Sequence, residues 1–233
     1  MPDKHVAFLL PTVAIVLIGD RLIDGVTQDK NIPYIINYLK LINHKLTEVR
    51  IIPDNRTVIT QTVKSLKHND YVITLGGIGP RDNAVTAEAI ADLFEVNVIY
   101  DISILELLKK YPEGMNDRRK RMALIPKGAQ LLENKLAEVP GFNIDNVYSI
   151  AGTPMIMQSM LDSVFNLMNV EILIVDNDEK LKSNLDTISK ISNEVIVSYY
   201  VPRLSHFWPK QVFIRSLNLT QLQNIKKIIQ KII

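Results

Sequence analysis

Residues 71–80 read YVITLGGIGP, an apolar run followed by three glycines within four positions. The first five residues are apolar and β-branched or aromatic for the most part, and they predict a buried strand. Residues 85–91 read VTAEAIA, which predicts the first turns of a helix. The glycines therefore lie between the carboxyl end of a strand and the amino end of a helix.

A glycine turn in this position is suited to hold an anion. Glycine tolerates positive φ and lets a ligand approach the backbone closely. The free N–H groups and the positive end of the helix dipole both favour a negative charge. Open α/β sheets bind phosphorylated ligands at this kind of strand end. We expect a phosphate at Gly76, Gly77, Ile78 and Gly79; the alternative is a tight turn without a ligand.

The composition bounds the fold and the partners. The chain has 233 residues, 47% of them hydrophobic, which suffices for one α/β domain with a small appendage. Its formal net charge of +2 gives no reason to expect nucleic acid or a membrane surface as a partner. Cysteine is absent, which excludes disulfides and thiolate zinc sites and is compatible with a reducing cytosol.

The apolar segment of residues 6–18 is interpreted as part of the core. It is shorter than the roughly 20 residues of a membrane span, contains Pro11 and lacks a small-residue cleavage site. Strands covered on both faces read as continuous apolar runs, so residues 13–18 predict a buried first strand. We expect a cytoplasmic protein that contacts no membrane.

The order of elements predicts a three-layer α/β fold. Strands and helices alternate, which favours a mostly parallel sheet with helices on both faces. The expected strands are residues 13–18, 48–52, 71–75 and 147–150, and helices are expected from residue 31, over 57–67, from 85, over 103–110 and over 155–165. Two loops, residues 125–129 and 139–142, bracket a small hairpin.

A smaller α+β segment is expected to follow. Strands at 172–175, 195–200 and 212–216 combine with helices at 179–191 and 219–232, a set large enough to bury its own core. The boundary is placed near Asn169. This gives a main domain of residues 1–169 and an appendage of residues 170–233.

Three aspartates are candidates for chemistry on a phosphate. Asp20 and Asp54 follow the first two strands, and Asp82 follows the glycine turn. Mg²⁺ is typically held by one or two carboxylates together with waters and phosphate oxygens. Asp20 and Asp54 are therefore the candidate metal ligands, and Asp54 and Asp82 the candidate catalytic residues. Alternatively, Asp54 caps the next helix and Asp20 forms a turn.

Four consecutive cations, Arg118 to Arg121, have two interpretations. Guanidinium groups offer bidentate donors and could clamp a pyrophosphate. The same run could equally be the solvated face of a helix.

Several motifs occur together in this chain. They are Gly19-Asp20, Asp29 with Asn31, Pro53-Asp54, residues 76–80 with Val85-Thr86, and residues 121–129, 140–142 and 151–158. Together they resemble the MoaB/Mog molybdopterin-binding domain family. The last three motifs resemble its CinA-type branch, which includes the N-terminal domain of animal FAD synthases.

The resemblance implies a ligand with a pterin or nucleotide joined to phosphates. Mog-type members adenylylate molybdopterin, and CinA-type members are associated with metal-dependent hydrolysis of dinucleotide pyrophosphates such as ADP-ribose or FAD. The family's motifs place Thr86, Arg121 and Gly152 beside the glycine turn in the phosphate or nucleotide site. Relatives commonly self-associate, so a homo-oligomer is expected.

The chain departs from the family pattern at its acidic positions. Arg21 stands where relatives usually have an acidic residue, and Asn83-Ala84 where they commonly have aspartate. Alanine cannot bind a metal or accept a proton, and Asp82 could substitute only if the loop path differs. These changes, with the positive charge of Arg81, should favour direct binding of an anion over a divalent cation.

Three functions remain open from the sequence. The first is binding of a nucleotide or pterin phosphate with weak metal-dependent pyrophosphatase activity, using Mg²⁺. The second is a binding or assembly module that keeps the fold and has lost catalysis. The third is molybdopterin adenylylation, against which the long C-terminal segment and the missing acidic residues both argue.

Overall fold

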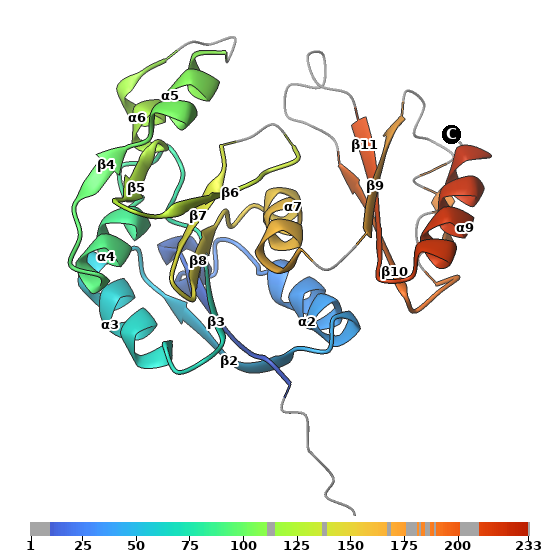
Figure 1. Cartoon of the computed structure of the whole chain (residues 1–233), viewed down its shortest axis with the longest axis horizontal. Helices are drawn as coiled ribbons and strands as arrows, with labels where there is room; N and C mark the ends of the chain where they lie inside the picture. The colour runs from blue at the N-terminus through green and yellow to red at the C-terminus, as the bar shows by residue number, and fades with distance from the viewer. Residues whose placement is uncertain are drawn as a thin grey trace, which may run out of the picture. The chain divides into compact units, whose positions relative to one another are not determined.

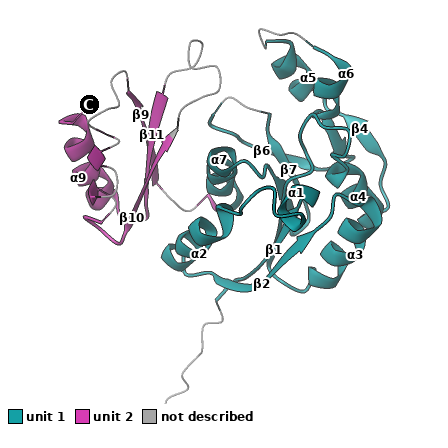
Figure 2. Ribbon diagram, turned by 180° about the vertical axis from the view of Figure 1, so that it is seen from behind, with its two compact units in different colours: residues 1–164 teal, residues 165–233 magenta. Residues whose placement is uncertain are grey.

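The computed structural model describes residues 10–110, 115–136, 139–166, 169–175, 181, 183–184, 187–188, 190–200 and 210–232. The chain divides into two compact units, residues 1–164 and 165–233 (Figure 2). The division falls a few residues before the boundary near Asn169 that the sequence suggests. Among the described residues, none of the helices has the length and apolar composition needed to span a bilayer.

A six-stranded sheet forms the centre of the first unit. Its strand order is β2-β1-β3-β8-β7-β6, and the pairs β2–β1, β1–β3 and β3–β8 are parallel. These strands are β1 (Thr12–Ile18), β2 (Lys45–Ile52), β3 (Tyr71–Leu75) and β8 (Val147–Ile150), followed by the antiparallel β7 (Gly141–Ile144) and β6 (Gln130–Leu132). The mainly parallel sheet confirms the fold expected from the sequence.

Helices cover both faces of this sheet (Figure 1). One face carries α3 (Arg56–Leu66) and α4 (Thr86–Leu93), and the other carries α2 (Asn31–Leu41) and α7 (Pro154–Phe165). Residues 13–18 of β1 are all buried, because their side chains point alternately to the two covered faces. On the α3 and α4 side, Val16 of β1 belongs to the same buried cluster as Val63 and Ile90.

The middle of the chain differs in part from expectation. Helices α5 (Ile102–Lys109) and α6 (Asp117–Arg121) stand beside an antiparallel pair of β4 (Val98–Tyr100) and β5 (Leu124–Pro126), a pairing that the sequence did not suggest. The expected hairpin is formed instead by β6 and β7. A short helix, α1 (Asp20–Ile23), follows β1 after the single residue Gly19.

The described part of the second unit contains a three-stranded antiparallel sheet packed against helix α9. The strands are β9 (Asn169–Val175), β10 (Val195–Tyr200) and β11 (Lys210–Ser216), in the order β10-β11-β9. The helix α9 (Leu219–Gln230) contributes Leu222, Ile225 and Ile229 to a buried cluster with Val212 and Ile214 of β11. Much of the helix expected at 179–191 lies outside the described residues.

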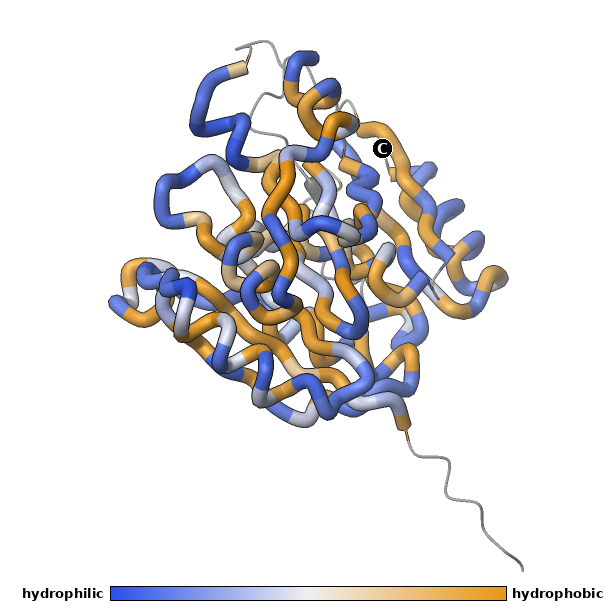
Figure 3. The backbone as a smooth tube through the Cα atoms, turned by 60° about the vertical axis from the view of Figure 1, so that its left-hand side comes forward, coloured by the Kyte–Doolittle hydropathy of each residue, from blue (hydrophilic) through white to orange (hydrophobic). Residues whose placement is uncertain are grey.

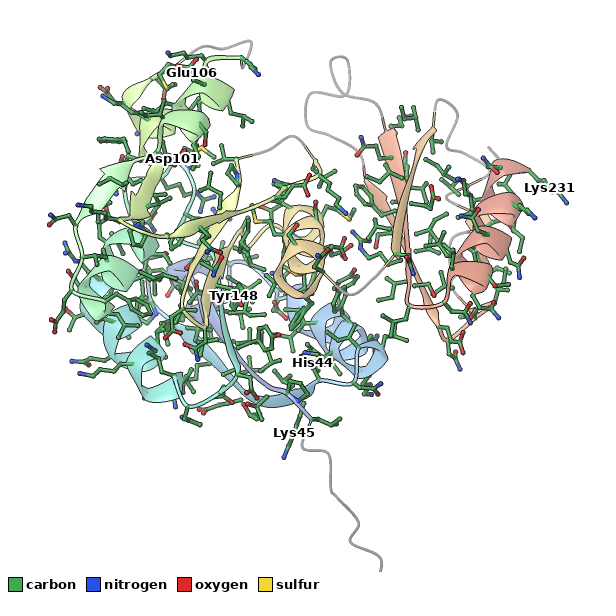
Figure 4. The ribbon with its side chains drawn as sticks, in the orientation of Figure 1. His44, Lys45, Asp101, Glu106, Tyr148 and Lys231 are labelled. Carbon is green, nitrogen blue, oxygen red and sulfur yellow. The ribbon has the colours of Figure 1, made fainter. Side chains whose placement is uncertain are left out.

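Hydrophobic residues follow the strands, and hydrophilic residues concentrate at turns and outer helix surfaces (Figure 3). His44 and Tyr148 lie near the amino ends of the parallel strands (Figure 4). The ring centroid of Tyr71 lies 5.5 Å from that of His44 and 5.6 Å from that of Tyr148. The predicted aspartates and the glycine turn lie at the opposite edge, beyond the carboxyl ends of the parallel strands.

Candidate functional site

The carboxyl ends of the parallel strands bring the predicted site residues to one edge of the main sheet. Ile18 of β1 pairs with Ile52 of β2, so Asp20 and Asp54 each lie two residues beyond a paired position. The neighbouring strands β3 and β8 end at the same edge. The glycine loop, defined as residues 76–80, follows β3 directly.

Two glycines of the loop adopt backbone conformations that other residues rarely take. Gly76 has φ of 110° and Gly77 has φ of 67°. A Cβ atom at Gly76 would lie 2.5 Å from the carbonyl oxygen of Ile18, and one at Gly77 would overlap the Thr86 hydroxyl. At Gly79, by contrast, no atom lies within 4 Å of the added Cβ position. The first two glycines are thus needed for the turn itself, whereas Gly79 borders open space.

Thr86 fastens the loop to the start of α4. Its hydroxyl donates to the Gly76 carbonyl oxygen at 3.0 Å, and its N–H donates to the Gly77 carbonyl oxygen at 3.1 Å. The Thr86 side chain is fully buried. In the described part of the chain, no acceptor takes a hydrogen bond from the N–H groups of Gly77, Ile78 and Gly79. These three residues are half-buried, so their donors remain available at the amino end of a helix.

Asp20 and Asp54 are held together by their own backbones. The Asp20 N–H donates to Oδ2 of Asp54, and the Asp54 N–H donates to Oδ1 of Asp20, both at 3.1 Å. The Asn83 amide also donates to Oδ2 of Asp54 at 3.0 Å. Burial raises the pKa of Asp54 and the charge of Asp20 adds to this, while the Asp20 N–H and Arg81 act in the opposite direction.

The cap of α3 is Asn55 and not Asp54. The Asn55 side chain accepts the N–H of Val58 at 3.1 Å, as expected of a helix N-cap. The interpretation of Asp54 as the helix cap is therefore wrong. Its carboxylate instead accepts the N–H of Asp20.

The carboxylate pair is the closest approach to a metal site. Among the described residues, no three His, Cys, Asp or Glu side chains gather as a metal-binding group. Two carboxylates alone suit a Mg²⁺ ion that takes its other ligands from water and phosphate oxygens. Ala84 supplies no ligand, and the exposed Arg21 donates to the Thr27 hydroxyl at 3.4 Å. These groups suit a Mg²⁺ ion that binds together with a phosphate ligand better than an ion held by protein groups alone.

Asn31 links α2 to the loop after β8, a role that sequence reasoning missed. Its side-chain amide donates to the Gly152 carbonyl oxygen at 2.9 Å. Asp29 accepts the N–H groups of Asn31 and Ile32 and so begins the helix. A Cβ at Gly152 would lie 3.5 Å from Cα of Gly76, which puts this segment against the glycine loop. The spacing Asp29-x-Asn31 was the available signal.

Asn31 also carries a buried acceptor. The residue is 6% exposed, and its Oδ1 atom has no hydrogen-bond partner within the described chain. A buried polar atom without a partner is costly, so this oxygen marks a place for a water or a ligand donor.

Arg121 contacts α4 and the residue before it. Its Nη2 donates to the Ala84 carbonyl oxygen at 2.9 Å and to Oε1 of Glu88 at 3.1 Å. The side chains are 30% and 20% exposed. Arg121 thus anchors α6 against the amino-terminal part of α4, next to the glycine loop.

Asp82 turns away from the other aspartates and toward α6. Its carboxylate lies 3.6 Å from Nη2 of Arg118, an exposed ion pair. The two residues border an open pocket of about 550 Å³, called here the arginine pocket, which is lined by residues 80–83 together with Asn116, Arg118 and Arg119. Asp82 lies in this pocket, and Asn83 both lines the pocket and reaches the carboxylate pair.

Comparison with known proteins decides the family. The family model described as "Probable molybdopterin binding domain" matches residues 14–170. The chain belongs to the MoaB/Mog molybdopterin-binding domain family. The match covers the main sheet from Ala14 of β1 onward and every candidate site residue of this MoaB/Mog protein.

The relatives point to the CinA-type branch of the family. A CinA-like protein of Thermosipho melanesiensis is 30% identical over 132 residues, which are 54% of this chain and 33% of that protein. The MoaB/Mog protein therefore spans only about a third of that CinA-like relative. A protein of Archaeoglobus fulgidus is 25% identical over 193 residues, 80% of this chain and 84% of its own length.

A solved structure shows the same fold. The crystal structure of CinA from Thermoplasma acidophilum, described as a protein of unknown function, has a TM-score of 0.62 and 22% identity. It covers 67% of this MoaB/Mog protein and 97% of its own chain.

Proposed function

We propose that the first unit binds the phosphate of a nucleotide or pterin ligand at the glycine loop. The observation that carries the proposal is the set of unengaged N–H groups at Gly77, Ile78 and Gly79. They belong to the loop that Thr86 ties to the amino end of α4, where the helix dipole favours an anion. Family membership supports a phosphorylated ligand of this kind.

A second candidate, weak hydrolysis of a dinucleotide pyrophosphate, is favoured by the pairing of Asp20 with Asp54. These carboxylates would hold a Mg²⁺ ion, which when bound would neutralise charge on the pyrophosphate and lower the pKa of a water. Residues that weaken this candidate are Ala84, which offers no ligand, and Asn83, whose amide donates to Asp54. A module that binds without catalysis is the direct alternative.

Calorimetry with AMP, ADP-ribose and FAD, with and without Mg²⁺, tests the binding proposal. We expect all three to bind, because each presents a phosphate to the glycine loop. Binding of none of them would refute the proposal. Tighter binding in Mg²⁺ that disappears in Asp20→Asn would support a cation at the carboxylate pair.

The variant Ala84→Asp separates weak hydrolysis from loss of catalysis. It restores the acidic residue common in relatives, and Ala84→Asn is the matched uncharged control. Hydrolysis of ADP-ribose by the natural protein, raised further in Ala84→Asp, would support an active enzyme. Hydrolysis seen in Ala84→Asp alone would identify the natural protein as a non-catalytic binder.

A further inference from the structure

The basic run of residues 118–121 is divided by the fold. Lys120 extends its amine over the ring of Tyr100, 5.1 Å from the centroid, and Arg121 pairs with Glu88. Arg118 and Arg119 instead line the arginine pocket. Arg118 and Lys120 are exposed, as the solvated-face interpretation expects, whereas Arg121 is tied to α4.

Helix α6 (Figure 1) forms one wall of the arginine pocket and is held in place at both of its ends. At the start of the helix, the Asn116 side chain accepts the N–H of Arg119 at 2.9 Å. At its end, Arg121 is tied to the Ala84 carbonyl oxygen. The opposite wall is residues 80–83, which continue directly from the glycine loop. The two walls are thus fixed by local hydrogen bonds before any ligand arrives.

The charge of the pocket favours an anion. Arg81 and Arg118 line the pocket together with one acidic residue, Asp82, and Arg119 lies beside them. Arg118 and Asp82 are 74% and 78% exposed, and their atoms are 3.6 Å apart. Exposed pairs of this kind contribute little, so a phosphate could displace Asp82 and gain charge-assisted bonds to Arg118.

We propose that the arginine pocket is a second anion subsite that takes a further phosphoryl group of the ligand bound at the glycine loop. The inference rests on the proposed function, since the first phosphoryl group is placed at Gly77 to Gly79. Gly79 and Arg81 are two residues apart, so their Cα atoms are separated by at most about 7 Å. Pro80 belongs to the glycine loop and also lines the pocket, so the two phosphoryl groups of one pyrophosphate could occupy the two neighbouring places.

The test compares inorganic phosphate with pyrophosphate by NMR titration of the whole chain. Phosphate is expected to shift the backbone amides of the glycine loop. Pyrophosphate is expected to shift the same amides and also the side-chain Nε–H signals of Arg118 and Arg119. In Arg118→Gln, pyrophosphate affinity should fall about fivefold while phosphate affinity stays within about twofold.

Lys127→Gln is the matched control, because Lys127 is an exposed cation outside the pocket. It should leave both affinities within about twofold. Asp82→Asn provides a second variant in the opposite direction, since it removes the competing carboxylate, and should tighten pyrophosphate binding about threefold.

The outcomes separate the two proposals. If phosphate shifts the loop amides but Arg118→Gln weakens both anions equally, the subsite is overturned and the glycine-loop site stands. If neither anion shifts the loop amides, the proposed function fails, and the subsite for the same ligand fails with it. Selective loss of pyrophosphate affinity in Arg118→Gln, with tightening in Asp82→Asn, supports the subsite.

Discussion

Asp20 and Asp54 each accept a hydrogen bond from the other's backbone N–H group, at the same distance of 3.1 Å. The two residues are 34 positions apart, yet the parallel pairing of β1 with β2 brings them together. This reciprocal arrangement joins the loops after both strands and holds two carboxylates side by side. It therefore serves the structure of the sheet edge whether or not a cation binds there.

The pH dependence of stability should reveal the cost of the Asp54 charge. The folded-state pKa is raised from the ordinary value of 3.8, chiefly by burial, so folding favours the protonated form. The Asp54 carboxyl group therefore contributes to the free energy of unfolding below its ordinary pKa. This contribution is lost as the pH rises through the pKa of the folded state. Asp54→Asn should therefore be more stable than the natural protein at neutral pH, with the difference vanishing in acid.

Thermal unfolding in the presence of a chelator, between about pH 3 and pH 8, measures this difference. Asparagine keeps a side-chain oxygen that accepts the N–H of Asp20, so this hydrogen bond is present in both proteins. An Asp54→Asn protein less stable than the natural one at neutral pH would contradict the prediction. It would mean that hydrogen bonds stabilise the charge more than burial opposes it.

Gly77 and Gly79 should respond differently to alanine. Gly77→Ala places a Cβ against the Thr86 hydroxyl in a backbone of positive φ, and should cost at least about 2 kcal/mol of unfolding free energy. Gly79→Ala meets no atom within 4 Å and should change stability by less than about 0.5 kcal/mol. Denaturant unfolding of both variants checks this, and equal losses would contradict the described loop.

A charge placed at Gly79 should repel the ligand without disturbing the fold. Gly79→Asp adds a carboxylate in open space beside the free N–H groups. Affinity for AMP should fall at least about tenfold, since like charges at this range repel by more than about 1.4 kcal/mol. The effect should weaken at high salt.

Gly79→Asn is the control for size, because it differs from the aspartate in charge alone. It should bind AMP within about threefold of the natural protein. Equal loss in both variants would indicate a steric effect and remove the support for an anion at this loop.

Arg121 should matter for stability in a way that a surface arginine does not. Arg121→Gln leaves the partly buried Glu88 without its partner and should cost about 1–2 kcal/mol. Arg50→Gln breaks the more exposed pair with Glu48 and should cost less than about 0.5 kcal/mol. Urea unfolding measures both.

A comparison with Glu88→Gln then assigns the role of Arg121. That variant breaks the same pair but keeps the cation. Normal ligand affinity in Glu88→Gln, with weak affinity in Arg121→Gln, would place the guanidinium group in contact with the ligand. If the two variants bind the ligand with equal affinity, Arg121 acts only as an anchor for α6.

Local sequence was enough to predict the main sheet and the glycine loop. The continuous apolar run of β1 implies burial on both faces, and the run ending at Leu75 followed by glycines implies a strand and a turn. Gly76 and Gly77 could be recognised because few other residues adopt positive φ. The carboxyl ends of parallel strands meet at one edge, so Asp20 and Asp54 could be expected to converge.

Side-chain partners far apart in the chain could not be predicted in the same way. Asn31 with Gly152 and Arg121 with Ala84 are separated by 121 and 37 positions, and no local pattern encodes such contacts. The choice of Asn55 over Asp54 as the helix cap depended on a shift of one residue, which either side chain allows chemically.

The sequence by itself determined which segments are buried and where the backbone must turn, because hydrophobicity and permitted φ are properties of single residues and their near neighbours. Only the tertiary structure decided which charges face one another. In the folded chain Asp82 lies next to Arg118, Asn83 next to Asp54 and Arg121 next to Glu88. The physical reason is that a hydrogen bond or ion pair depends on distances of a few ångströms, which the packing of distant elements sets.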